Sequence, residues 1–180
     1  MTITEQGGGR RGNSLRIVIW GVAVFALLLP WVAMQFTDEV VWDFADFAVF
    51  GSMLLLVCGS YELATRLTGN KAYRLALGIA LVGVFLLIWI NLAVGIIGNE
   101  GNPANMMFFA IPVVGVVGAL IARFEPRGMA RALLATAIAQ ALVAVIALIA
   151  GWGFIIFLTV FFVSLWLTSA GLFWKSRKKT

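Results

Sequence analysis

The sequence has no histidine, a single cysteine and few charged residues. Histidine is the commonest general base and the commonest transition-metal ligand in proteins. Its absence excludes a histidine-ligated haem, a zinc hydrolase and a Ser-His-Asp triad. Cys58 alone cannot form a disulfide within the chain. We therefore expect a protein that is not an enzyme and that holds neither a metal nor a cofactor.

Charge is scarce because apolar residues take up most of the chain. Hydrophobic residues make up 62% of the 180 positions, charged residues 12%, and the mean hydropathy is +1.03. Soluble domains are about 45–50% apolar and about 25% charged. A fold of this length in water cannot bury so much apolar surface, so the excess must face lipid.

Six apolar stretches are present, each close to the ~20 residues that a helix needs to cross ~30 Å of hydrocarbon. Backbone polar groups in lipid must be satisfied within the segment, which favours helices. The fold class is therefore all-α, a compact bundle of six transmembrane helices over residues 14–175. The expected spans are Leu15–Phe36, Asp43–Arg66, Tyr73–Ile97, Ala104–Arg123, Met129–Ala150 and Phe154–Trp174.

The last two spans are divided by a short glycine-containing segment. Met129–Trp174 is one apolar run, and Gly151-Trp152-Gly153 is its only interruption. A single helix over that run would be about twice the thickness of the membrane. Glycines around a tryptophan suit a tight turn at the interface, so we expect a hairpin.

The basic residues predict that both termini are cytoplasmic. With six spans and the N-terminus inside, all 13 Lys and Arg residues fall on the inner side. The charged residues of the outer segments are then all acidic. This placement makes nucleic acid a poor partner despite the net charge of +5. We expect a disordered tail over residues 1–13 and a basic tail over 176–180. The residues expected to set topology and contact anionic lipid are Arg66, Arg74, Arg123, Arg131 and Lys178.

Polar residues in the outer half of the membrane are the candidates for a site. Asp43, Asp46, Asn91 and Asn105, with Glu100 nearby, could line an acidic vestibule that attracts a cation or a polar solute. The alternative is structural. Asp43 and Asp46 then favour the positive end of a helix dipole, and Asn102 caps the helix that begins at Pro103.

The remaining membrane-depth polar residues have plausible packing roles. Gln140 lies at the middle of the fifth span, where a hydrogen bond between helices is the expected role. Glu62 precedes Arg66 by four residues, which predicts an ion pair. We expect the fourth span, which has small residues at helical spacing, and the alanine-rich fifth span to be central. The aromatic sixth span is then left to face lipid or a partner.

Several stretches resemble a group of small bacterial multi-pass proteins. They are Trp42–Phe47, Leu92–Gly98 with Gly101–Asn105, and Ala122–Phe124 with Arg127–Ala132. The resemblance implies a bacterial inner-membrane setting and no activity. In size and topology the chain is also similar to the substrate-binding subunits of energy-coupling-factor vitamin transporters, with no binding residue carried over.

Two functions fit these features. The first is a small permease or solute-binding membrane subunit with the acidic, outward-facing vestibule. The second is a non-catalytic accessory subunit of a larger membrane complex, or a homo-oligomer, that docks through the sixth span. In either case the lipid bilayer is the expected partner, with anionic lipids at the cytoplasmic face.

Overall fold

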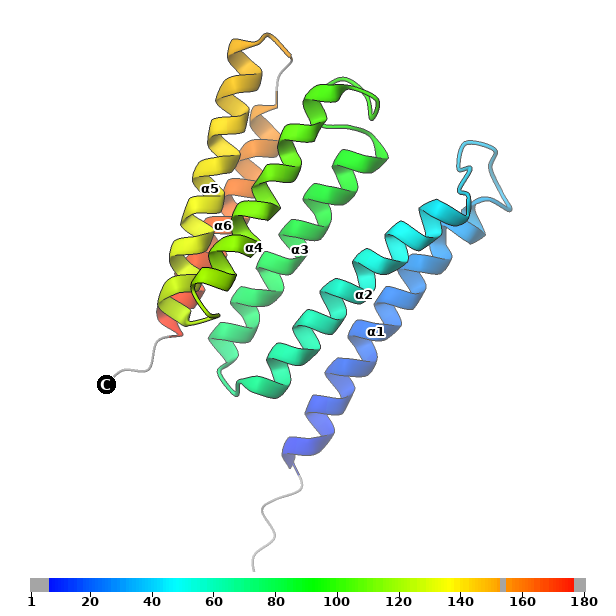
Figure 1. Ribbon diagram of the computed structural model, residues 1–180. Helices are drawn as coiled ribbons and strands as arrows, with labels where there is room; N and C mark the ends of the chain where they lie inside the picture. Colours follow the sequence, from blue (N-terminus) through cyan, green and yellow to red (C-terminus); the bar gives the residue numbers. More distant parts are fainter. Residues whose placement is uncertain (1–6, 153–154, 177–180) are drawn as a thin grey trace, which may run out of the picture. The chain divides into compact units, whose positions relative to one another are not determined.

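The computed structural model of the chain describes residues 7–152 and 155–176, all helix and connecting turns. In this part of the chain, six helices are long and apolar enough to cross a membrane, as predicted. Their bounds are α1 Gly7–Ala33, α2 Phe44–Leu67, α3 Lys71–Ala93, the 3-10 helix η1 Pro103–Phe109 continued by α4 Ala110–Ile121, α5 Pro126–Ile149 and α6 Ile156–Lys175 (Figure 1).

The chain divides into two compact units, Met1–Leu63 and Ala64–Thr180. The first contains α1 and most of α2. The second contains α3, η1, α4, α5 and α6, and its helices are joined by short turns. The sequence predicted a disordered tail over residues 1–13, but α1 begins at Gly7, so part of this tail is helical. Residues 1–6 and 177–180 lie outside the described residues.

The core of the second unit lies where α5 and α6 pack against α3 and α4. Ala147, Phe162, Trp166 and Phe173 are fully buried there. α5 carries the largest set of buried residues, which confirms its predicted central place. α4 is less central than predicted, because Val113, Val116, Val117 and Leu120 are exposed on it.

The sixth helix corrects a prediction. Its aromatic side chains were expected to face lipid or a partner, but Phe162, Trp166 and Phe173 are buried in the core of their own unit. Among the described aromatic residues of this span, Phe157, Phe161 and Trp174 keep substantial exposure. The buried set is spaced four and seven residues apart, so it occupies one face of α6. The prediction is therefore wrong for the buried residues, and docking through the exposed aromatic residues of α6 stays a prediction.

Small residues allow the close approach of α4 and α5. A Cβ atom on Gly118 would lie 2.7 Å from the Cβ atom of Ala132, and one on Gly115 would lie 3.2 Å from the hydroxyl oxygen of Thr136. Pro112 stands in the first turn of α4, where a backbone N–H has no partner in the helix. The 3-10 helix η1 gives way to α-helix two residues before Pro112.

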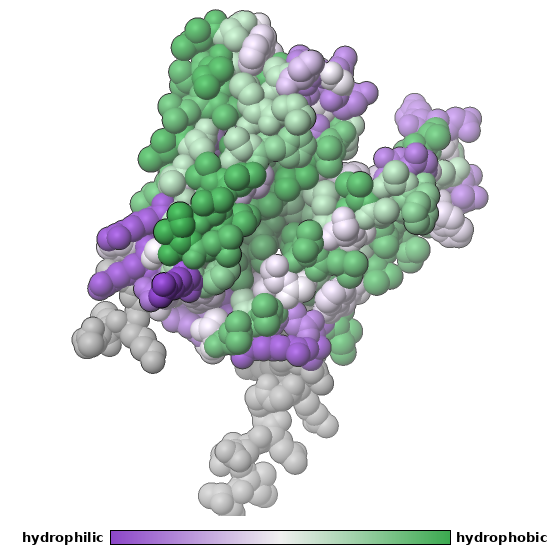
Figure 2. All heavy atoms as spheres, in the orientation of Figure 1, coloured by the Kyte–Doolittle hydropathy of each residue, from purple (hydrophilic) through white to green (hydrophobic). Residues whose placement is uncertain are grey.

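The surface between the helix ends is apolar. Hydrophobic side chains cover the visible face of α4 and α5 in Figure 2, and hydrophilic ones gather toward the ends of the helices. The exposed apolar residues on this pair of helices include Val116, Leu120, Leu134, Ile138 and Leu142. An exposed apolar surface of this extent is what a membrane-spanning unit presents to lipid.

The turn after α5 ends that helix at a glycine, as the sequence suggested. Gly151 adopts a left-handed conformation with φ of 69°, and the N–H of Trp152 donates to the carbonyl of Ala147 over 3.0 Å. This is the closure that commonly ends a helix before glycine. α5 and α6 are therefore separate helices, as expected, although Gly153 and Phe154 lie outside the described residues.

Candidate functional site

The interior of the second unit contains polar atoms that have no hydrogen-bond partner. Four such buried side-chain atoms occur in the part of the chain that the structure describes: Asn91 Oδ1, Gln140 Oε1, Thr159 Oγ1 and Trp166 Nε1. All four belong to α3, α5 or α6. We refer to these four residues as the interior polar set.

Asn91 lies near the end of α3 and is 3% exposed. Its amide nitrogen donates to the backbone carbonyl of Asn105 over 3.0 Å. This bond fixes the orientation of the carboxamide and leaves Oδ1 inside the bundle without a donor. The side chain is thus held in place by one of its ends, and the other end remains available.

Gln140 is 1% exposed at the middle of α5, and its Oε1 has no donor. The hydrogen bond between helices that the sequence predicted for it is not among its contacts in the described chain. Thr136, one turn earlier on α5, is equally buried, but its hydroxyl donates to the carbonyl of Ala132 over 2.9 Å. Two buried polar residues on the same helix therefore differ: one is satisfied by its own helix and the other is not.

Trp166 is fully buried on α6 and packs against α3. A Cβ atom added at Gly83 would lie 2.7 Å from the ring atoms Cη2 and Cζ3, so the indole occupies the space that a side chain would take. The ring also stacks on Phe162, with centroids 6.3 Å apart. Its Nε1–H group is a donor that this packing leaves without an acceptor.

The interior polar set occupies two depths in the membrane-spanning unit. Gln140 lies nine residues before the end of α5 and Trp166 ten residues after the start of α6, so both lie about 14 Å from the turn that joins these helices. Gly83 is the residue of α3 that the Trp166 ring contacts. Asn91 lies eight residues beyond Gly83, so it is about 12 Å closer than Trp166 to the same end of the unit. Thr159 precedes Trp166 by seven residues, about 10 Å in the same direction.

Polar groups at the opposite end of the unit are paired with other helices or turns. The Asn70 amide donates to the carbonyl of Ser176 over 2.7 Å, and the Tyr73 hydroxyl donates to the carbonyl of Phe124 over 2.9 Å. The Ser169 hydroxyl donates to the carbonyl of Ala76 over 2.6 Å. Hydrogen bonds thus join elements at both ends of the unit, since Asn91 also donates to Asn105, whereas Gln140 and Trp166 keep unpartnered atoms near the middle of their helices.

The end of the unit opposite the α5–α6 turn also carries basic residues. Arg74 donates to the carbonyls of Thr68 and Thr65, at 2.7 and 2.5 Å, which closes the end of α2. Arg123 and Arg131 are exposed at the α4–α5 turn and the start of α5. Arg66 lies in the last turn of α2, where a cation is favoured by the helix dipole. Lys178 lies outside the described residues.

Asn105 organises the loop between α3 and η1. Its Oδ1 accepts from the N–H groups of Ile96 and Ile97, at 3.0 and 2.8 Å, and its Nδ2 donates to the carbonyls of Ile97 and Asn99, at 3.3 and 2.6 Å. Gly95 stands against Nδ2 with φ of 71°. These contacts occupy the whole carboxamide. The predicted site residue therefore has a structural role, and Glu100 lies exposed on the same loop.

Asp43 and Asp46 begin α2 and bind each other's backbone. The N–H of Asp43 donates to Asp46 Oδ2 over 2.9 Å, and the N–H of Asp46 donates to Asp43 Oδ1 over 3.0 Å. This reciprocal arrangement is a capping box, a structural role at the start of the helix, where the sequence analysis considered only the helix dipole. The two aspartates belong to the first unit and Asn91 and Asn105 to the second, so a vestibule built from all four stays a prediction.

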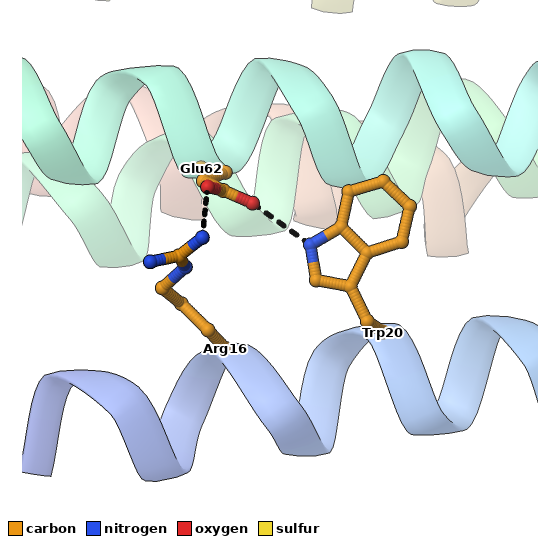
Figure 3. A network of polar contacts seen from close by, with 3 residues as sticks. All are labelled: Arg16, Trp20 and Glu62. Carbon is orange, nitrogen blue, oxygen red and sulfur yellow. Dashed lines mark hydrogen bonds and ion pairs between the residues drawn. The ribbon is translucent and has the colours of Figure 1, made fainter.

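Glu62 joins α2 to α1 within the first unit. Its carboxylate accepts from Arg16 over 2.7 Å and from the indole N–H of Trp20 over 2.8 Å (Figure 3). The sequence analysis named Arg66 as the partner of Glu62, which stays a prediction, and it did not name Arg16 or Trp20. Arg16 and Trp20 are four residues apart, so they share one face of α1, and that spacing was the available signal.

Comparison with known proteins yields no relative. No protein-family profile, no curated protein and no solved structure matches this chain. The fold and the polar contacts define a multi-pass, all-helical membrane protein.

Proposed function

We propose that this chain is a small permease or solute-binding membrane subunit of a bacterial inner membrane, without catalytic activity. Its solute site lies in the interior polar set of the α3–α6 unit. The observation that carries the proposal is that Asn91 and Gln140, both more than nine-tenths buried, hold carboxamide oxygens with no donor. A solute that donates hydrogen bonds would satisfy each of these oxygens in turn as it passes into the unit.

The energetics favour a ligand over a purely structural role. A buried acceptor without a partner costs about 1–3 kcal/mol. Thr136 has its own helix carbonyl as partner, whereas a glutamine at position 140 adds a cost that an apolar residue would avoid. Polar side chains inside a membrane protein commonly mark the path of a solute, and sites that bind ligands are often less stable than the rest of the fold.

The direction of access follows from the charges. We infer that the end carrying Arg74, Arg123 and Arg131 faces the cytoplasm, together with both termini. The half of the unit with unpartnered polar atoms then faces outward, on the side of Glu100. Hydrogen bonds between helices close the inner end. A solute would therefore enter from the outer side and reach Asn91 and Thr159 before Gln140.

The experiment compares two substitutions on one helix. Gln140→Leu removes the unpartnered acceptor and keeps nearly the same volume, while Thr136→Val removes a hydroxyl that already has a partner. We expect Gln140→Leu to raise the free energy of unfolding in detergent by about 1–3 kcal/mol. We also expect it to abolish the rise in melting temperature that a bound solute gives the natural protein.

The same screen tests the proposal directly. Purified protein is heated with a broad panel of neutral, cationic and anionic solutes, and each melting temperature is compared among the natural protein, Gln140→Leu and Thr136→Val. A solute that stabilises the natural protein and Thr136→Val, but not Gln140→Leu, supports the site. The proposal fails if Gln140→Leu destabilises the protein and no solute gives a response that depends on Gln140.

A further inference from the structure

The chemistry of the interior polar set also bears on the class of solute. This inference rests on the proposed function and narrows it. The unpartnered atoms are two carboxamide oxygens, one hydroxyl and one indole N–H, and all four groups are neutral. They supply acceptors from Asn91 and Gln140, a donor from Trp166, and a group on Thr159 that can do either.

The surroundings of these atoms are also neutral. In the described chain, the buried polar residues are Asn91, Asn105, Thr136, Gln140, Ser169 and Ser176, and each is uncharged. The rest of the core is built from residues such as Leu87, Ile111, Ala144, Phe162 and Phe173. An ion held in such an interior would lose its hydration without gaining an opposite charge, which is far more costly than burying a neutral polar molecule.

The charged residues of the unit lie near the ends of its helices. Lys71, Arg123, Arg127 and Lys175 are exposed at one end, and Glu100 is exposed at the other. Gln140 and Trp166 are about 14 Å from the α5–α6 turn, so they lie well inside the bundle. The acidic residues expected from the sequence to attract a cation are thus not part of the interior polar set.

We propose that the site takes an uncharged organic solute that carries both hydrogen-bond donors and acceptors, such as an amide or a polyol. The donors of the solute bind the oxygen of Gln140, and an acceptor on it binds the indole N–H of Trp166, which lies at the same depth, while Asn91 lies on the way in from the outer end. This preference excludes ions of either sign, because the site offers hydrogen bonds but no compensating charge.

The test uses probe pairs of nearly equal shape and different charge. Urea is compared with guanidinium, and acetamide with acetate, in the detergent-purified full chain. For each probe the change in melting temperature of Gln140→Leu is subtracted from that of the natural protein, which cancels general effects of the probe on stability. At about ten times its Kd, a bound probe should raise the melting temperature by about 3–6 °C.

We expect urea and acetamide to give a positive difference, and guanidinium and acetate to give none. Thr136→Val should respond to urea and acetamide as the natural protein does. A positive, Gln140-dependent difference with guanidinium or acetate would overturn the preference for uncharged solutes while leaving the solute site itself in place. If no probe of any charge gives a Gln140-dependent difference, the solute site and the preference both fail.

Discussion

Asn105→Ala is expected to be one of the most damaging single substitutions in the second unit. Asn105 is 4% exposed, and its carboxamide makes four hydrogen bonds to the loop between α3 and η1. Alanine leaves the N–H groups of Ile96 and Ile97 without their acceptor. Each unpartnered buried donor costs about 1–3 kcal/mol, so the free energy of unfolding should fall by about 2–6 kcal/mol.

The assay is a reversible titration with sodium dodecyl sulfate, followed by helical circular dichroism. Asn99→Ala is the matched control, because its side chain accepts a single exposed bond, from the N–H of Gly101 over 3.1 Å. We expect the control to cost less than about 1 kcal/mol. The reasoning would be refuted if the two variants were equally stable, since Asn105 would then not hold the loop.

Further substitutions test the packing, the first unit and the topology. Gly83→Ala should lower the free energy of unfolding by about 1–3 kcal/mol, because its Cβ would lie 2.7 Å from the Trp166 ring. Gly171→Ala is the control, because no atom lies within 4 Å of its added Cβ, and it should be neutral or stabilising. Equal losses of stability for the two variants in thermal unfolding would contradict the packing of Trp166 on Gly83. Glu62→Ala should destabilise the first unit by about 1–3 kcal/mol in the same titration, since Arg16 and Trp20 lose their acceptor, and an unchanged midpoint would count against the network. For the topology, single cysteines are introduced into a Cys58→Ala variant. Trp152→Cys should react with an impermeant maleimide in intact cells, and Gly69→Cys should react only after lysis. The reverse pattern would show that the proposed orientation is wrong.

The number of spans could be predicted because lipid imposes a minimum length on each apolar helix. The end of α3 could not. The apolar run continues through Ile96 and Ile97, so the sequence predicted a span to Ile97, but α3 ends at Ala93. The N–H groups of both isoleucines bind Asn105, which lies eight or nine residues further on. A local pattern does not reveal a side chain that competes for the backbone from beyond a turn.

Only part of the candidate site could be predicted, because it also depends on contacts between segments far apart in the sequence. The sequence analysis named Asn91 as a candidate site residue and Gln140 as a residue for packing between helices; both are buried, and a role in solute binding stays a proposal for each. Trp166 was assigned to a lipid or partner face because composition alone does not say which side of a helix faces inward. Arg16 was missed as a partner of Glu62 because it lies 46 residues away along the chain, and only folding brings the two together.

The bond between Ser169 and Ala76 has a consequence for how the protein is made. These residues are 93 positions apart, so α3 leaves the ribosome long before its main packing partner exists. Until α6 has been synthesised and released, the face of α3 around Gly83 has no indole to cover it. Synthesis of this chain therefore includes an interval in which α3 is complete and the core of the second unit is not.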